Sequence, residues 1–156
     1  MKFRTIDDIG KRVQSITSDN HKVLGKWSAA QNFYHLAAAF EATVISRPSG
    51  SPPVKPKVGR VLRWFVTRVK FPPFISIPEE VRDRLEPPAD AEFETQKRRL
   101  LESIERFREF DGVHPPHPVL GPLTRKEWIG FHLRHCQHHL AFIKVTDESA
   151  GGGARN

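Results

Sequence analysis

Apolar residues recur at steps of three and four along much of the chain, a spacing typical of helices that bury one face. The first such stretch predicts a helix over 6–16, with Thr5 and Asp8 in an N-cap arrangement in front of it. Another stretch predicts a long helix over 90–110. Asp111 and Gly112 stop this helix, and Gly112 is the expected cap because glycine readily adopts the left-handed conformation found there.

Two further helices begin with the spacing of a capping box, in which a Ser or Thr and a Glu or Gln three residues later satisfy each other's backbone N–H groups. Ser28 and Gln31 have this spacing, and we expect their helix to run to residue 46. Thr124 and Glu127 have it too, and we expect their helix to run to residue 145. Four helical patterns without a convincing alternating strand favour an all-α four-helix bundle.

The connection between the second and third helices is long and irregular. Its first part, 47–56, contains four prolines and is predicted to be a loop. The stretch 58–70 predicts a short amphipathic helix, which the Phe-Pro-Pro-Phe sequence at 71–74 interrupts. We expect one domain over 1–146, followed by a flexible, glycine-containing tail over 147–156.

The length of 156 residues suits one domain, and the net charge of +7 suggests at first a nucleic-acid partner. Six of the 25 basic residues, however, lie in the segment 55–70, which contains no acidic residue. The other 19 basic residues nearly balance the 18 acidic ones. The charge therefore belongs to one segment of an otherwise nearly neutral domain, and we do not expect nucleic acid as its main partner.

Cysteine usage and apolar runs indicate where the protein is located. The single cysteine, Cys136, cannot form an internal disulfide, which fits a reducing compartment. No apolar run approaches the length of a membrane span, and the N-terminus shows no apolar core of a secretory signal. We expect a cytoplasmic protein without a transmembrane segment.

Four of the eight histidines lie between residues 128 and 139. On a helical wheel, His132, His135 and His139 share the apolar face that we expect to point into the core. Burying several imidazoles is costly unless their ring nitrogens find partners, and a metal ion is the simplest shared partner. His135 and His139 stand four residues apart, so their rings project side by side from successive turns.

The third ligand of such a metal should come from a facing helix, and His35 is our candidate because it lies among small alanines. Three neutral imidazoles leave a coordination position for water or substrate, as in catalytic sites. They suit zinc or nickel, with iron as a further candidate. We expect three more side chains to line the site or support its ligands: Gln31, Trp128 and His132.

Other interpretations of these histidines stay open at this point. The cluster over 132–139 could be a polar, solvent-facing histidine run that binds metal only adventitiously. His35 could be a core residue satisfied by hydrogen bonds. His132 and Cys136 form a rival pair at the same spacing of four.

Three segments of the chain resemble the DinB-like superfamily of small helical proteins, and within it a branch known mainly as a domain of unknown function. They are Trp27-Ser28 with Phe33-Tyr34-His35-Leu36, then 117–124 with Glu127-Trp128, and finally 135–140. The resemblance implies a four-helix bundle that binds one divalent metal through three histidines, which here are His35, His135 and His139. It also implies a homodimer, and its characterised members include thiol-dependent S-transferases and a thiol-dependent isomerase.

The first functional hypothesis is therefore a metal-dependent enzyme. It would be thiol S-transferase-like, with a low-molecular-weight thiol and a small electrophile as substrates, or hydrolase-like, with water in the place of the thiol. The chain shows no Ser-His-Asp set, glycine-rich phosphate loop or paired carboxylates that would indicate metal-free catalysis.

The alternative is a non-catalytic bundle that binds an anionic membrane, a nucleic acid or a protein through its basic segment. Six residues would form this face: Lys55, Lys57, Arg60, Arg63, Arg68 and Lys70. The competing interpretation of this segment is a surface helix whose apolar stripe packs on the bundle while its charges are solvated.

Overall fold

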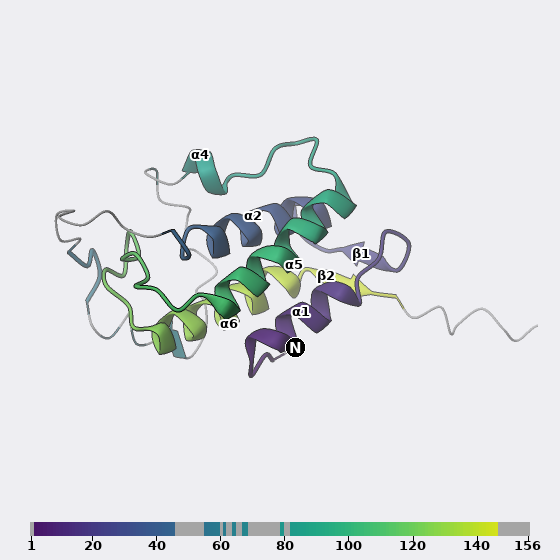
Figure 1. Ribbon diagram of the computed structural model, residues 1–156. Coiled ribbons are helices and arrows are strands. Elements are labelled where there is room, and N and C mark those ends of the chain that lie inside the picture. The colour runs from purple at the N-terminus through teal and green to yellow at the C-terminus, as the bar shows by residue number, and fades with distance from the viewer. Residues whose placement is uncertain are drawn as a thin grey trace, which may run out of the picture.

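The computed structural model describes residues 2–45, 55–59, 61, 64, 67–68, 79 and 82–146. Helices make up most of it, with a two-stranded sheet at one end (Figure 1). The four longer helices are α1 (Ile6–Gln14), α2 (Ala29–Glu41), α5 (Phe93–Glu109) and α6 (Arg125–Leu140). The short helix α4 (Arg82–Leu85) precedes α5, and the strands are β1 (His21–Val23) and β2 (Ile143–Val145).

All four predicted helices are present, and three of them begin at the capping residues expected from the sequence. Thr5, Ser28 and Thr124 each accept a hydrogen bond from the backbone N–H three residues later, and that residue's side chain accepts one from the cap backbone. These reciprocal bonds satisfy two N–H groups that the first turn of a helix leaves unpaired. Local sequence alone therefore determines where these helices start.

The ends of two helices differ from the prediction. The helix expected to run to residue 46 ends at Glu41, and the helix expected to run to residue 145 ends at Leu140. Beyond Leu140 the chain turns and forms β2, which pairs antiparallel with β1 in the register Val23↔Ile143. The expectation of a chain without strands was thus wrong for these six residues. Strands of three residues are too short for an alternating pattern to show in the sequence.

The core lies between α1, α2, α5 and α6. α2 packs mainly against α5, and α6 contacts both α1 and α2. Fully buried side chains from all four helices meet here, among them Ile9, Phe33, Phe40, Phe107 and Leu140. Burying one such side chain contributes about 1.5–3 kcal/mol, so this packing holds α2 and α6 in fixed positions.

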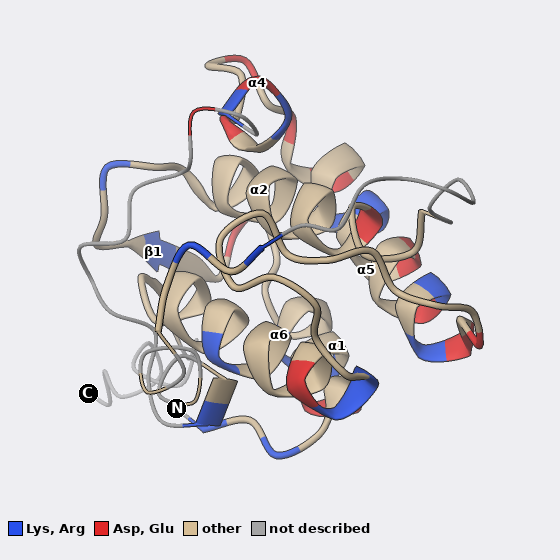
Figure 2. Cartoon of the chain, turned by 90° about the vertical axis from the view of Figure 1, so that its left-hand side faces the viewer, with Lys and Arg blue, Asp and Glu red and all other residues tan. Residues whose placement is uncertain are grey.

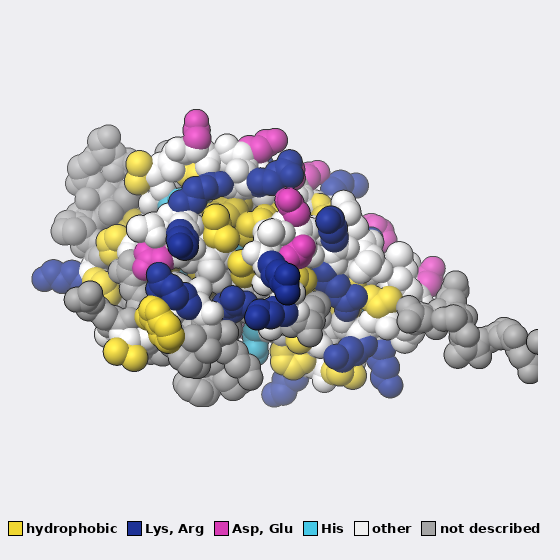
Figure 3. All heavy atoms as spheres, turned by 90° about the horizontal axis from the view of Figure 1, so that it is seen from below, with side chains coloured by type: hydrophobic (Ala, Val, Ile, Leu, Met, Phe, Trp, Pro, Cys, Tyr) yellow, Lys and Arg dark blue, Asp and Glu magenta, His cyan; other side chains and the backbone are white. Residues whose placement is uncertain are grey.

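Charged residues are frequent in α1, α4, α5 and the first turn of α6, whereas α2 contains only one, Glu41 (Figure 2). Glu41 at the end of α2 accepts two hydrogen bonds from Arg99 of α5, at 2.9 and 2.7 Å. On the face seen in Figure 3, Lys and Arg side chains are spread among Asp and Glu, so that surface has mixed charge. None of the described helices is long and apolar enough to span a membrane.

The long connection between α2 and α5 is described only in part. Positions 61, 64, 67 and 68 are helical, in agreement with the helix predicted over 58–70. The break predicted over 71–74, most of the loop predicted over 47–56 and the tail predicted over 147–156 lie outside the described residues. The backbone at Thr67 passes so close to α6 that a Cβ atom at Gly130 would lie 2.2 Å from the Thr67 carbonyl oxygen.

Two glycine substitutions test this close approach as a matched pair. Gly10 lies in α1, and a Cβ atom added there would meet nothing within 4 Å, so Gly10→Ala should raise the free energy of unfolding by about 0.5–1 kcal/mol. Gly130→Ala should lower it by about 1–3 kcal/mol, because the new methyl group displaces Thr67. Urea unfolding followed by circular dichroism measures both values. Stabilisation by both substitutions would contradict the contact.

Candidate metal centre

Three histidines from two helices meet in the interior. His35 comes from α2, and His135 and His139 come from successive turns of α6. One ring nitrogen from each lies within 4.8 Å of the other two, and Nε2 of His35 is 3.0 Å from Nε2 of His135. His35 and His135 are only 4% and 5% exposed, and His139 is partly buried. The structure thus brings together the three residues that the sequence singled out.

Hydrogen bonds at the opposite ring nitrogens orient two of these imidazoles. His35 donates from Nδ1 to the backbone carbonyl oxygen of Leu85 in α4, at 2.8 Å. His139 donates from Nδ1 to Oδ1 of Asn32, at 3.1 Å. In a neutral imidazole with its proton on Nδ1, Nε2 keeps a lone pair. Both rings therefore present Nε2 as an acceptor or ligand, which is how acceptors behind a metal site orient its histidines.

Asn32 contacts one of the candidate ligands and was not among the site residues expected from the sequence. Its amide nitrogen donates to the backbone oxygens of Trp27 and Ser28, at 3.3 and 2.9 Å, so its oxygen has to face His139. The side chain is 2% exposed, and it is held at the start of α2. A buried amide one turn before a candidate ligand, on the same side of the helix, is the sequence signal that could have identified it.

Burial keeps all three imidazoles neutral. It is the main cause that lowers the pKa of His35, and it lowers the pKa of His135 and His139 well below the usual value. The neighbouring imidazoles lower the pKa of His135 further, because one positive charge disfavours another nearby. Neutral rings are the form that binds metals.

Aromatic side chains form the walls of the cluster. The Trp27 ring stacks on His139 at 5.7 Å between centroids and lies against His35 at 5.1 Å. On the other side Phe131 contacts His135 at 5.3 Å. These rings pack over two sides of the imidazole cluster.

The donor set and its spacing fit one divalent ion. Because Nε2 of His35 is an acceptor, Nε2–H of His135 donates to it at 3.0 Å when no ion is bound, and a divalent ion would take the place of that proton. Nitrogens bound to a tetrahedral zinc ion at about 2.0–2.1 Å lie roughly 3.3 Å apart. The His35–His135 separation of 3.0 Å is close to this value, and all three pairs of ligand atoms lie within 4.8 Å.

The other predicted site residues lie beside this cluster or behind it. His132 is fully buried and stacks on Phe40 at 3.9 Å between centroids, and Trp128 stacks on His132. The Gln31 side chain completes the α2 capping box and donates to the backbone oxygen of Pro88. None of the three belongs to the group of converging ligand atoms found among the described residues.

Three of the remaining four histidines and the cysteine lie outside the group of converging ligand atoms. His114 donates to the backbone oxygen of Thr43, and His117 accepts two hydrogen bonds at Nδ1 from backbone N–H groups of its own turn. His138 contacts the rings of His139 and Phe142. Cys136 is fully buried, and burial raises the pKa of its thiol, so it stays protonated.

Three of the six residues of the candidate anion-binding face are among the described residues. Lys55, Lys57 and Arg68 are exposed. The backbone N–H of Lys57 donates to the carbonyl oxygen of Val119, which ties this part of the connection to the turn before α6. The other three residues of the face, Arg60, Arg63 and Lys70, lie outside the described residues.

Asn32→Ala should weaken metal binding about 10- to 100-fold, because His139 loses the acceptor that fixes its proton on Nδ1. Gln31→Ala is the matched control, since it removes a neighbouring amide that contacts no candidate ligand. Competition with a chromophoric zinc chelator measures both affinities. Equal weakening by the two substitutions would show that Asn32 acts only through the stability of α2.

His117 should make stability pH-dependent without taking part in the site. Burial lowers the pKa of His117 to about 4, whereas the unfolded chain protonates this residue near pH 6.5. The unfolded state therefore binds more protons between these values, and this residue makes the free energy of unfolding fall as the pH falls, by about 1.4 kcal/mol per pH unit. His117→Asn keeps an acceptor for the turn but cannot titrate. Urea unfolding at several pH values should show a shallower slope for this variant, and an unchanged slope would contradict the assignment.

Comparison with known proteins identifies the family of this chain. No curated protein and no solved structure matches the chain. A family model described as a protein of unknown function, DUF1569, matches residues 1–146, which include every helix and strand described above. The chain therefore belongs to the DUF1569 family.

Proposed function

We propose that this protein is a metal-dependent enzyme of the DinB-like type, in which His35, His135 and His139 hold one divalent ion. The observation that carries the proposal is the convergence of three buried, neutral imidazoles from two helices. Nitrogen ligands favour zinc or nickel, with iron as the further candidate, over magnesium and calcium, which prefer oxygen. The resemblance of the chain to DinB-like proteins supports the same three ligands.

The reaction best suited to this site is transfer of a low-molecular-weight thiol to a small electrophile. A divalent ion with three protein ligands has a position open for substrate, where it lowers the pKa of a bound thiol or water. Water in that position would give the hydrolase-like form of the same proposal. In both forms Trp27 and Phe131 line the site, because their rings pack against His35 and His135.

The thiol in this proposal has to come from outside the chain. Cys136 is the only cysteine, and its side chain is fully buried in the core. Burial also raises the pKa of its thiol, and a protonated thiol is a poor nucleophile. Cys136 is not among the residues whose ligand atoms converge with those of His35.

The other residues of the site act by orienting the ligands. The Leu85 carbonyl holds the proton of His35 on Nδ1, and the Asn32 amide does the same for His139. Since both acceptors are fixed by the fold, the two Nε2 atoms need little reorganisation to bind an ion.

Metal content of the purified protein tests the ligand assignment. We expect about one equivalent of metal per chain for the wild type, and loss of most of it in His35→Ala and in His139→Ala. His138→Ala is the matched control, because it removes the neighbouring imidazole that is outside the cluster. Stoichiometric metal that survives both ligand substitutions would contradict the site.

A cobalt-loaded sample tests the thiol-transfer form. Adding cysteine or glutathione should produce a sulfur-to-cobalt charge-transfer band in the near ultraviolet, and His135→Ala should abolish it. A spectrum that neither thiol changes would contradict thiol transfer and favour the hydrolase-like form.

A further inference from the structure

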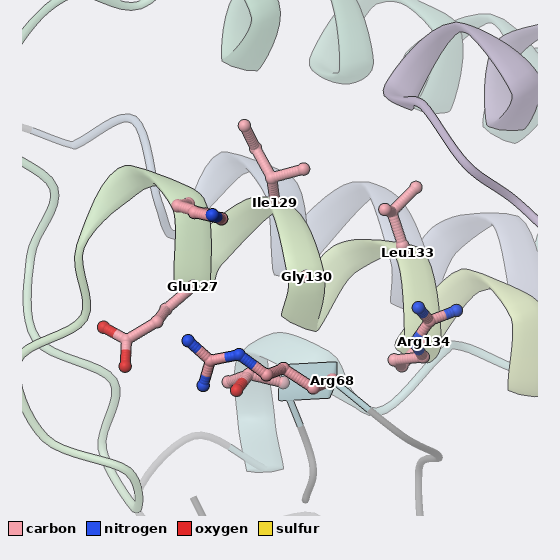
Figure 4. A pocket seen from close by; sticks show the side chains of 8 residues that line it. Arg68, Glu127, Ile129, Gly130, Leu133 and Arg134 are labelled. Carbon is pink, nitrogen blue, oxygen red and sulfur yellow. The ribbon is translucent and has the colours of Figure 1, made fainter. Parts of the chain in front are cut away.

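A second candidate site lies on a face of α6 that the proposed reaction does not use. A hollow of about 240 Å³ is bordered there by Arg68, Lys126, Ile129, Gly130, Leu133 and Arg134, among others. Figure 4 shows Arg68 on one side of α6 and the side chains of Ile129 and Leu133 directed to the other side, with Gly130 between Glu127 and Arg134. The three candidate metal ligands do not line this hollow.

The spacing of residues along α6 explains the hollow. Lys126, Gly130 and Arg134 follow one another at steps of four, so they form one row on the helix surface. Because Gly130 has no side chain, the Thr67 carbonyl fits against the helix there and borders the hollow, between two cations whose backbones are about 12 Å apart along the helix axis. Ile129 and Leu133 also border the hollow; Ile129 is partly buried and Leu133 is 6% exposed.

The cations around the hollow lack acidic partners within the described part of the chain. Arg134 makes one long hydrogen bond there, from Nη1 to Gln137 at 3.3 Å, and its Nε is buried without a hydrogen-bond partner among the described residues. Neither Arg68 nor Lys126 forms an ion pair with a described acidic residue.

One acidic residue, Glu127, also borders the hollow, but its carboxylate is engaged at the start of the helix. Its Oε2 accepts hydrogen bonds from the backbone N–H and the hydroxyl of Thr124, at 2.9 and 3.0 Å. Three cations and one capping carboxylate leave an excess of positive charge, which concentrates anions at a concave surface.

We propose that this hollow binds a small amphipathic anion, with its carboxylate between Arg68, Lys126 and Arg134 and its apolar part against Ile129 and Leu133. The volume corresponds to about eight water molecules, which limits the ligand to a short alkyl or aryl carboxylate. Arg68 comes from the basic segment 55–70, so this site gives one residue of that segment a specific role. The proposal does not depend on metal binding.

Octanoate is the probe, with 1-octanol as the neutral analogue and inorganic phosphate as the anion without an apolar part. Titrations followed by ¹H–¹⁵N correlation spectra should show octanoate binding, with shifts centred on the amides of residues 126–134. Binding should weaken with added salt. We expect octanol and phosphate each to bind at least tenfold more weakly.

Charge-removing variants complete the test. Lys126→Gln should weaken octanoate binding about threefold. Arg134→Gln should weaken it about tenfold, because Arg134 is less exposed than Lys126. Lys22→Gln in β1 is the matched control for an exposed lysine away from the hollow and should leave the affinity unchanged. Shifts centred elsewhere, an affinity equal to that for octanol, or no effect of Lys126→Gln would each overturn the proposal. If Lys126→Gln and Arg134→Gln keep the wild-type metal content, the anion site is independent of the metal site, and a failure of the anion proposal leaves the proposed function unaffected.

Discussion

The arrangement of this protein depends on one constraint, which is that buried imidazole nitrogens need partners. Five histidines have their pKa lowered chiefly by burial, and three of them meet at the contact between α2 and α6. An unpartnered buried polar group costs about 1–3 kcal/mol. A fold that collects such groups in one place therefore either loses stability or supplies a shared partner. At the 3.0 Å contact between Nε2 of His35 and Nε2 of His135, the two imidazoles are each other's partner, and an ion bound there would replace the shared proton.

The supporting contacts connect this cluster to the rest of the fold. His35 reaches α4 through the Leu85 carbonyl, and His139 reaches the start of α2 through Asn32. Because Asn32 is itself held by the backbone at Trp27 and Ser28, the capping box that starts α2 also fixes an acceptor of the site. Local helix chemistry and site geometry are thus parts of one hydrogen-bond network, and the Trp27 ring packs against two of its imidazoles.

Much of this could be predicted from sequence, because the signals are local. The capping boxes at Ser28 and Thr124 define helix starts within four residues, and the spacing of His135 and His139 places both rings on one helix face. The features that were not predicted depend on contacts between residues far apart in the sequence. β2 exists because it pairs with β1 more than a hundred residues away, and Leu85 contributes only a backbone carbonyl, which no residue type indicates. The hollow at Gly130 likewise needs the approach of the segment at Thr67 and Arg68.

The binding of one divalent ion by these three histidines is the feature on which the proposed chemistry depends. Crystals of the metal-loaded protein, measured at the absorption edge of the bound metal, test it most directly. We predict one anomalous peak at about 2.0–2.1 Å from Nε2 of His35, His135 and His139 when the metal is zinc. A peak at other residues, or a loaded crystal in which His35 and His135 still bond directly to each other, would contradict it.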